Sequence, residues 1–330
     1  MRIGTLDQQL RRLSLRDLRI FLAVVERGNL AKAASSLSIS RPVVSKSVAN
    51  LERVLGVRLL DRSPQGIAPT NYGYALIRRG TAMFDELRHS LDEIRHLAAP
   101  GSGELRIGAS EYMAAGLVSY VVNRLSRRFP ALHFQVELDG TIGKLRERKI
   151  ELVVTRLLSP QVDPDLQAEV LFHERVYVAA GPTNKHVGRR RIAVRELIAE
   201  PWILAPPEVV EGSPLVEAFR AAGHSLPPAT VLGLSLPLRN GLLATGRFLT
   251  IVPGSVLRFG AERVLLKTLP VDVPDWRLPV AILTLRDRSL TPLANVFIEE
   301  VRAAVGTMSH RSTGRRNKTR HPEKPKSART

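Results

Sequence analysis

The sequence contains no cysteine among its 330 residues. This excludes disulfides, thiolate metal sites and cysteine nucleophiles, and a cytosolic setting is the simplest expectation for such a chain. No run of 18 apolar residues is present, so we expect no membrane-spanning helix and no membrane partner. The first fifteen residues are polar and charged, without an apolar stretch of signal-peptide length.

Sequence motifs of several enzyme classes are also missing. There is no Gly-x-Ser-x-Gly, no Walker A, no His-Glu-x-x-His and no dinucleotide fingerprint. The eight histidines are scattered and form no metal-ligand pattern. Glu111 and Asp139 are two carboxylates that nothing in the sequence brings together. We therefore expect a protein that is not an enzyme and needs no cofactor or metal.

Positive charge is in excess and lies at the two ends of the chain. The net charge is +18, of which residues 1–70 carry +7, residues 101–308 carry +4 and residues 309–330 carry +7. Basic ends indicate a polyanionic partner, either nucleic acid or an anionic membrane surface, although solubility alone would also explain them. Residues 309–330 have almost no apolar content and predict a disordered basic tail.

The N-terminal region predicts short helices joined by a tight turn. Ser14 begins a helix with a wide apolar face that Gly28 ends, and Asn29 caps a second, alanine-rich helix up to Leu37. Ser40 is placed to cap a third helix. The apolar residues of this third helix recur at spacings of four and three: Val44, Val48, Leu51 and Leu55. Its opposite face is polar and positive, as a helix that reads the major groove requires.

Residues 57–70 predict a two-stranded wing around a Pro/Gly turn, which completes a winged helix-turn-helix over residues 1–70. The candidate DNA-binding residues are Arg41, Pro42, Ser45, Lys46 and, on the wing, Arg62. Arginine is the usual bidentate reader of guanine, and proline offers apolar contact to a thymine methyl group. We expect base contacts from Arg41 and Ser45 and phosphate contacts from Lys46 and Arg62.

Residues 71–99 predict one long amphipathic linker helix without proline. Its small and apolar residues recur every three or four positions: Leu76, Gly80, Met83, Leu87, Leu91, Ile94 and Ala98. The stripe either packs on its own chain or meets a second copy. We favour dimerisation, because a small head offers little surface to cover so long a helix.

Strands and helices alternate beyond the Pro/Gly linker at residues 99–103, which predicts an α/β domain with a largely parallel sheet over residues 103–308. Open α/β sheets bind ligands at the carboxyl ends of their strands. The candidate effector-binding residues follow such strands or precede a helix: Ser110, Tyr112, Thr141, Arg156 and Ser235. Each of them is equally accounted for as a solvated loop residue or helix cap. Arg156 and the helix N-termini favour an anionic ligand such as a carboxylate or sugar acid.

The chain resembles the LysR-type transcriptional regulators. The resemblance rests on these segments: Leu18–Phe21, Ala31–Ala34, Ser40–Lys46, Leu51-Glu52, Leu55-Gly56, Leu59–Arg62, Pro69-Thr70, Gly103–Gly108, Phe129-Pro130, Glu200–Trp202 and Gly246–Pro253. It implies a winged head, a linker-helix dimer, usually within a tetramer, and a periplasmic-binding-protein-like α/β effector domain of two subdomains. Subdomain I would comprise residues of about 103–160 and 268–308, and subdomain II residues of about 161–267. Arg41 stands where the family most often has glutamine, and the basic tail lies outside the family pattern.

Together these features predict a cytoplasmic homodimer or homotetramer that activates or represses transcription at a dyad-like site on double-stranded DNA. A small molecule bound between the two subdomains would tune this activity. The main alternative is an architectural DNA-binding protein whose α/β domain senses nothing. An enzyme fused to a DNA-binding head and an exported solute-binding protein are further alternatives, disfavoured by the missing motifs and export signal.

Overall fold

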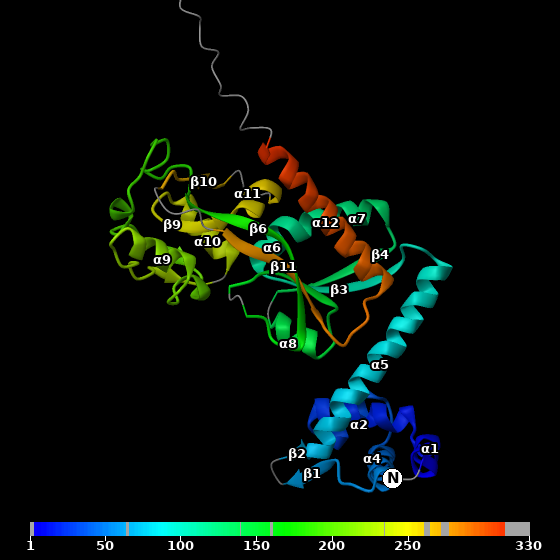
Figure 1. Ribbon diagram of the computed structural model, residues 1–330. Coiled ribbons are helices and arrows are strands. Elements are labelled where there is room, and N and C mark those ends of the chain that lie inside the picture. The colour runs from blue at the N-terminus through cyan, green and yellow to red at the C-terminus, as the bar shows by residue number, and fades with distance from the viewer. Residues whose placement is uncertain are drawn as a thin grey trace, which may run out of the picture. The chain divides into compact units, whose positions relative to one another are not determined.

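Short helices and a two-stranded wing form the N-terminal unit (Figure 1). The computed structural model describes residues 3–63, 66–138, 140–158, 161–233, 235–260, 265–271 and 277–313. The chain divides into two units, Met1–Leu91 and Asp92–Thr330. The helices of the first are α1 (Ile3–Arg12), α2 (Leu15–Arg27), α3 (Leu30–Ser36) and α4 (Arg41–Leu55). Helix α1 was not predicted, although its apolar residues Ile3, Leu6 and Leu10 recur at helical spacing.

The predicted helix caps are confirmed at α2 and α3. The Ser14 hydroxyl accepts a hydrogen bond from the Asp17 amide at 3.4 Å, and the Asn29 side chain accepts one from the Ala31 amide at 2.7 Å. Gly28 ends α2 with a left-handed φ of 65°. The prediction for Ser40 is half wrong: it occupies the N-cap position of α4, but its side chain makes no capping hydrogen bond. Pro42, the second helical residue, lacks one of the amide donors that a capping hydroxyl reaches.

The wing packs against helix α4 of the head. Strands β1 (Leu60–Ser63) and β2 (Gly66–Pro69) pair antiparallel, with Leu60 opposite Pro69. One carboxylate oxygen of Glu52, on α4, accepts hydrogen bonds from the amides of Leu59 and Leu60 at 2.8 and 3.3 Å. The core beneath is apolar and fully buried: Phe21, Val24, Ala33, Val44, Val48, Leu51 and Leu59. These contacts fix the angle at which α4 leaves the core.

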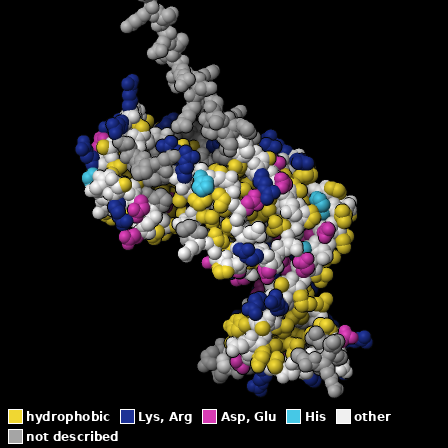
Figure 2. Space-filling model, in the orientation of Figure 1, with side chains coloured by type: hydrophobic (Ala, Val, Ile, Leu, Met, Phe, Trp, Pro, Cys, Tyr) yellow, Lys and Arg dark blue, Asp and Glu magenta, His cyan; other side chains and the backbone are white. Residues whose placement is uncertain are grey.

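The linker helix α5 (Asn71–Ala98) divides its predicted stripe between two uses. A Cβ at Gly80 would lie 3.0 Å from the Leu18 side chain, and Leu76 packs against the head core. That half of the stripe therefore packs on its own chain. Farther along the helix, the predicted residues Met83, Leu87, Leu91 and Ile94 stay 47–62% exposed, and Leu97, which was not part of the predicted stripe, is 75% exposed. Figure 2 shows hydrophobic side chains gathered on the surface in this part of the molecule.

A mixed sheet forms the core of the second unit. Its strands run in the order β10-β6-β11-β5-β3-β4, with β9 also paired to β6. Their bounds are β3 (Gly103–Ala109), β4 (Leu132–Glu137), β5 (Leu152–Arg156), β6 (Leu166–Ala180), β9 (Leu249–Pro253), β10 (Lys267–Thr268) and β11 (Arg277–Leu285). Among these described strands, β3 pairs parallel with β4 and with β5, whereas every pairing of β6 and β11 is antiparallel. The prediction of a largely parallel sheet is therefore wrong.

Helices cover both faces of the subdomain I sheet (Figure 1). Alternate residues of β5 show this, because Leu152 and Val154 join the core under α7 (Ser119–Arg128) and α12 (Pro292–Thr313), whereas Val153 joins the core under α8 (Thr141–Arg146). A short α6 (Glu111–Met113) and a π-helical turn (Ala114–Val118) lead into α7. The disordered tail was predicted from residue 309, but residues 309–313 continue α12; residues 314–330 lie outside the described part.

Subdomain II forms around the buried Trp202, which stacks edge-on against Phe219 and donates a hydrogen bond to the Leu197 carbonyl oxygen at 3.0 Å. Its remaining elements are the 3₁₀ turns Val194–Leu197 and Pro206–Glu208, β7 (Ile203–Leu204), α9 (Pro214–Ala221), β8 (Val231–Leu232), α10 (Leu236–Ala244) and α11 (Gly254–Phe259). The 15-residue strand β6 joins the subdomains, since its first part pairs with β11 and its last residues pair with β9.

Candidate functional site

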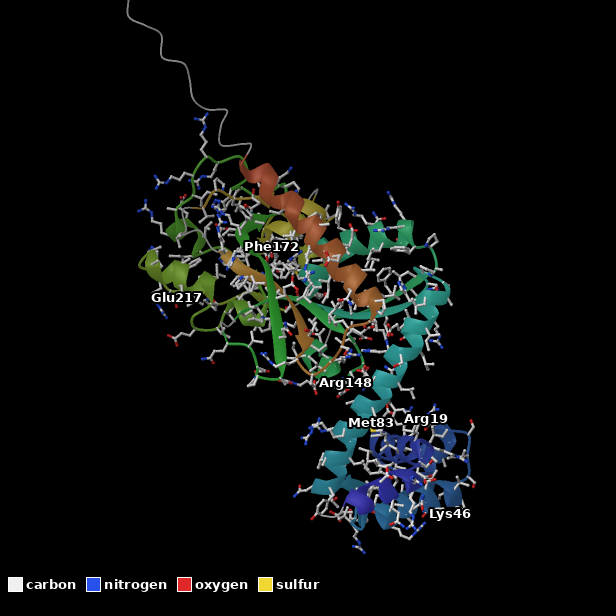
Figure 3. All side chains as sticks on the ribbon, turned by 45° about the vertical axis from the view of Figure 1, so that its right-hand side comes forward. Arg19, Lys46, Met83, Arg148, Phe172 and Glu217 are labelled. Atoms are coloured by element: carbon white, nitrogen blue, oxygen red, sulfur yellow. The ribbon has the colours of Figure 1, made fainter. Side chains whose placement is uncertain are left out.

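The outer face of α4 carries the predicted base- and phosphate-contacting residues together. Arg41, Pro42 and Lys46 are exposed, and Ser45 is half-buried between them. Lys46 is labelled in Figure 3, on the N-terminal unit. Among the described residues, neither Arg41 nor Lys46 has an ion-pair partner. Both cations are therefore available to an anion outside the chain.

Arg62 lies on β1, where its backbone pairs with Ile67 on β2. Its side chain is outside the described part of the structure, so its predicted phosphate contact stays a prediction. Asn50, farther along α4, donates a hydrogen bond to the Asp17 carboxylate on α2 at 2.6 Å. Asn50 therefore joins the two helices of the head and orients the exposed face of α4.

A second polar site lies between the two subdomains, around the ring of Tyr112. The guanidinium carbons of Arg156 and Arg239 lie 4.7 and 4.9 Å from the ring centroid, both within cation–π distance. The Tyr112 hydroxyl, from subdomain I, donates a hydrogen bond to the Ile251 carbonyl oxygen in subdomain II at 3.3 Å. A second contact joins the subdomains, since Glu111 accepts a hydrogen bond from the Leu236 amide at 3.1 Å.

Two buried carboxylates act electrostatically on the same arginine. Glu208 is 8% exposed and accepts from the Ala205 amide at 2.8 Å; Glu174 is 2% exposed and accepts from the Ser255 amide at 2.6 Å. Their other oxygens, Oε1 of Glu208 and Oε2 of Glu174, have no hydrogen-bond partner among the described residues. Burial raises the pKa of both carboxyl groups, and Arg156 opposes the rise in each. Burial, reinforced by Glu208, also raises the pKa of Tyr112 to about 12.

Arg156 ends β5, and its guanidinium lies over the face of Tyr112 and makes no hydrogen bond within the described residues. Such a planar group with unused donors is suited to a carboxylate or phosphate. Ser110, the N-cap of α6, likewise has a buried hydroxyl with no partner in the described part.

Two predicted effector residues are already engaged within the fold. Thr141 begins α8 and packs over Gly108, where an added Cβ would come within 3.0 Å of its side chain. Ser235 is exposed, and its hydroxyl accepts a hydrogen bond from the Leu238 amide at 3.4 Å as the cap of α10. Asp139 lies outside the described residues. Tyr112 and Arg156 are therefore the predicted residues that the structure places in contact, and Ser110 precedes Tyr112 by two positions.

Sequence reasoning missed the subdomain II half of this cluster: Glu174, Glu208, Arg239 and Ser255. Glu174 was missed because it lies on the first part of β6, and the mixed polar sequence there did not predict a strand before residue 176. Arg239 is 4% exposed although it lies on a short helix. A charged residue in an otherwise apolar helix was the available signal.

A hollow of about 530 Å³ lies elsewhere in subdomain II, near α9. Its charged lining residue Arg220 is already paired with Glu211 and Glu217, at 3.0 and 2.8 Å. These pairs leave Arg220 and Glu211 already engaged with charges of the chain itself.

Comparison with known proteins identifies both units. Residues 15–74 match the model of the bacterial regulatory helix-turn-helix proteins of the lysR family, and residues 98–306 match that of the LysR substrate binding domain. The chain belongs to the LysR family. It is a LysR-type DNA-binding transcriptional regulator with the α/β fold predicted from the sequence.

Similar LysR-type proteins cover nearly the whole chain. The regulator GbpR of Azospirillum brasilense is 30% identical over 91% of this chain and 89% of its own length. The regulator TfdS of Cupriavidus pinatubonensis is 30% identical over 89% of this chain and 99% of its own. The crystal structure of full-length CbnR with its target DNA superimposes with a TM-score of 0.61 at 21% identity, over 88% of this chain and 100% of CbnR. These relatives are named as regulators rather than enzymes.

The described residues contain neither a membrane-spanning helix nor a cluster of metal ligands. None of the described helices combines the length and apolarity that crossing a bilayer requires. No three His, Asp or Glu side chains in the described part are grouped so that they could hold a metal ion.

Proposed function

We propose that this LysR-type regulator binds a dyad-like double-stranded DNA site as a homodimer or homotetramer, and that a small effector bound between subdomains I and II tunes its activity. The observation that carries the effector proposal is the polar cluster around Tyr112. Within the described residues, the donors of Arg156 are unused and two buried carboxylates each keep an unpaired oxygen. Because its partner is DNA, the regulator would act in the cytoplasm.

DNA reading rests on the exposed face of α4. In a dimer the two copies of α4 would enter successive major grooves about 34–36 Å apart. Arg41 would read a guanine, Pro42 and Ser45 would contact neighbouring bases, and Lys46 and Arg62 would hold phosphates. Selection of bound fragments from a random DNA pool, followed by footprinting, tests this: two protected half-sites one helical turn apart are expected.

Dimerisation rests on the exposed half of the α5 stripe. Met83, Leu87, Leu91, Ile94 and Leu97 lie on one face of the helix and keep about half or more of their surface in solvent. An apolar stripe of this length on one helix is suited to pairing with a second helix.

Effector sensing would act through the contacts that join the subdomains. The Tyr112 hydroxyl and the Glu111 carboxylate both bond backbone groups of subdomain II. A ligand that enters beside Arg156 would displace the Tyr112 ring and change these bonds. Such a ligand regulates only if it binds two arrangements of the protein with different affinity.

The effector proposal is tested by a thermal-shift screen of the full-length protein against small carboxylates, sugars and amino acids, with and without DNA. A ligand that binds the folded state raises the melting temperature with dose. The shift should be lost in Arg156→Gln and kept in Arg195→Gln, a matched change on a subdomain II turn. Identical footprints and DNA bending with and without a bound compound would favour the alternative, an architectural DNA-binding protein.

A further inference from the structure

The cluster around Tyr112 contains two arginines and two buried glutamates, beside the Glu111 carboxylate that already accepts the Leu236 amide. Arg156 and Arg239 face the Tyr112 ring from within 5 Å, and Glu174 and Glu208 both act electrostatically on Arg156. Burial keeps the Tyr112 phenol uncharged at neutral pH, since its pKa is about 12. With both carboxylates ionised, the formal charges of the four residues cancel. A purely anionic ligand would therefore leave the cluster with excess negative charge.

The unused hydrogen-bonding atoms are also of both kinds. Arg156 offers N–H donors that make no hydrogen bond within the described residues. Glu208 Oε1 and Glu174 Oε2 are acceptors without a partner in the described part, on side chains more than nine-tenths buried. Leaving a buried carboxylate oxygen unbonded is costly, and a positively charged donor compensates it better than a neutral one.

Because unused donors of Arg156 and unpaired carboxylate oxygens occur in the same cluster, we infer that the effector is a small zwitterion of the amino-acid class. Its carboxylate binds the Arg156 guanidinium, and its ammonium group donates to the free oxygens of Glu208 and Glu174. This inference rests on the proposed effector function and replaces the purely anionic ligand favoured by the sequence. It also gives Glu208 a role in specificity, because that residue is required for the ammonium group and not for the carboxylate.

The test is a binding screen of the full-length protein by thermal shift, followed by isothermal titration calorimetry. The probes are the twenty standard amino acids, the matched acids that lack the amino group, the matched amines that lack the carboxylate, and a set of neutral sugars. We expect at least one amino acid to bind, and its deaminated and decarboxylated counterparts to bind about tenfold or more weakly, the loss expected for one charge-assisted hydrogen bond.

A pair of isosteric variants isolates the ammonium contact. Glu208→Gln keeps an acceptor for the Ala205 amide but removes the charge, so it should weaken amino-acid binding by about tenfold and leave binding of the deaminated acid within about twofold. The matched control is Glu211→Gln, a nearby carboxylate whose side chain is 86% exposed. This control should bind like the unmodified protein.

Each remaining outcome overturns the inference in a distinguishable way. If a deaminated acid or a neutral sugar binds at least as tightly as the best-binding amino acid, the inference of a zwitterion is wrong, but the proposal of effector sensing stands. If Glu208→Gln binds the amino acid normally, the ammonium assignment is wrong. If none of these compounds binds while DNA binding is intact, the inference fails, and the effector function itself must be sought with other ligand classes.

Discussion

Replacing one exposed residue of the linker helix should separate the dimer. Leu91 is 47% exposed on α5 within one chain. Burying a whole leucine side chain stabilises by about 1.5–3 kcal/mol, so covering the exposed half contributes about 1 kcal/mol per copy and about 2 kcal/mol per dimer. Leu91→Glu forfeits this and also brings two like charges to the interface. The dimer dissociation constant should rise about 30-fold or more.

Sedimentation equilibrium of the full-length variant measures this constant directly. Glutamate forms helices nearly as well as leucine, so circular dichroism should show an intact α5. The control is Val210→Glu, which introduces the same charge at a position 55% exposed in subdomain II. Affinity for a two-half-site DNA should fall with dimerisation, whereas affinity for a single half-site should not change. A Leu91→Glu protein that dimerises as tightly as the unmodified one would refute the assignment of this stripe to the interface.

Three further predictions follow from the head and the effector cluster. Lys46→Ala should weaken binding to all DNA sequences alike and reduce the slope of log K against log salt concentration by about 0.9. Arg41→Ala should instead lower the discrimination at one base pair by about 1–3 kcal/mol, and anisotropy titrations over a salt series separate the two effects. Tyr112→Phe removes the hydrogen bond to the Ile251 carbonyl oxygen and should lower the free energy of unfolding of the α/β domain by about 1 kcal/mol, as measured by urea denaturation. An unchanged urea midpoint would show that this hydrogen bond contributes nothing to stability. Burial raises the folded-state pKa of Glu208 above its ordinary value of 4.5, so the native state holds its proton to higher pH than the unfolded chain. The free energy of unfolding should therefore decrease as the pH rises from 4.5 through the raised pKa, and this decrease should be smaller in Glu208→Gln when urea midpoints are compared across that range.

The head was predictable because its signals are local. Ser14, Gly28 and Asn29 each act on residues within three or four positions, so their roles as caps could be derived from neighbours in the sequence. The burial of Val44, Val48 and Leu51 follows from helical periodicity in the same way. Ser40 shows the limit, since a capping residue in the right position still depends on which amide its hydroxyl reaches.

The LysR substrate binding domain was less predictable because its organisation depends on distant pairings. Residues 166–175 carry Glu169, His173 and Glu174, so no simple alternation marks them as a strand. They become one because β11, more than a hundred residues later, pairs with them. The same long-range pairing creates the antiparallel half of the sheet and brings Glu174 to the effector cluster. Ser110 and Arg156 were predicted as candidates because the carboxyl ends of parallel strands meet at one edge, a rule that needs no knowledge of distant partners.

In the proposed mechanism, Tyr112 competes with the effector for the space beside Arg156. Displacing its ring costs one hydrogen bond, about 1 kcal/mol, and two cation–π contacts of about 0.5–2 kcal/mol each. A ligand must regain this energy before any affinity is measured, so only a molecule that satisfies both the guanidinium and the buried carboxylates binds well. The same contacts join the subdomains, and a ligand that replaces them couples its own binding to their arrangement. Tyr112→Ala should therefore bind effector more tightly while transmitting less of its effect to DNA, a separation that a purely structural tyrosine would not produce.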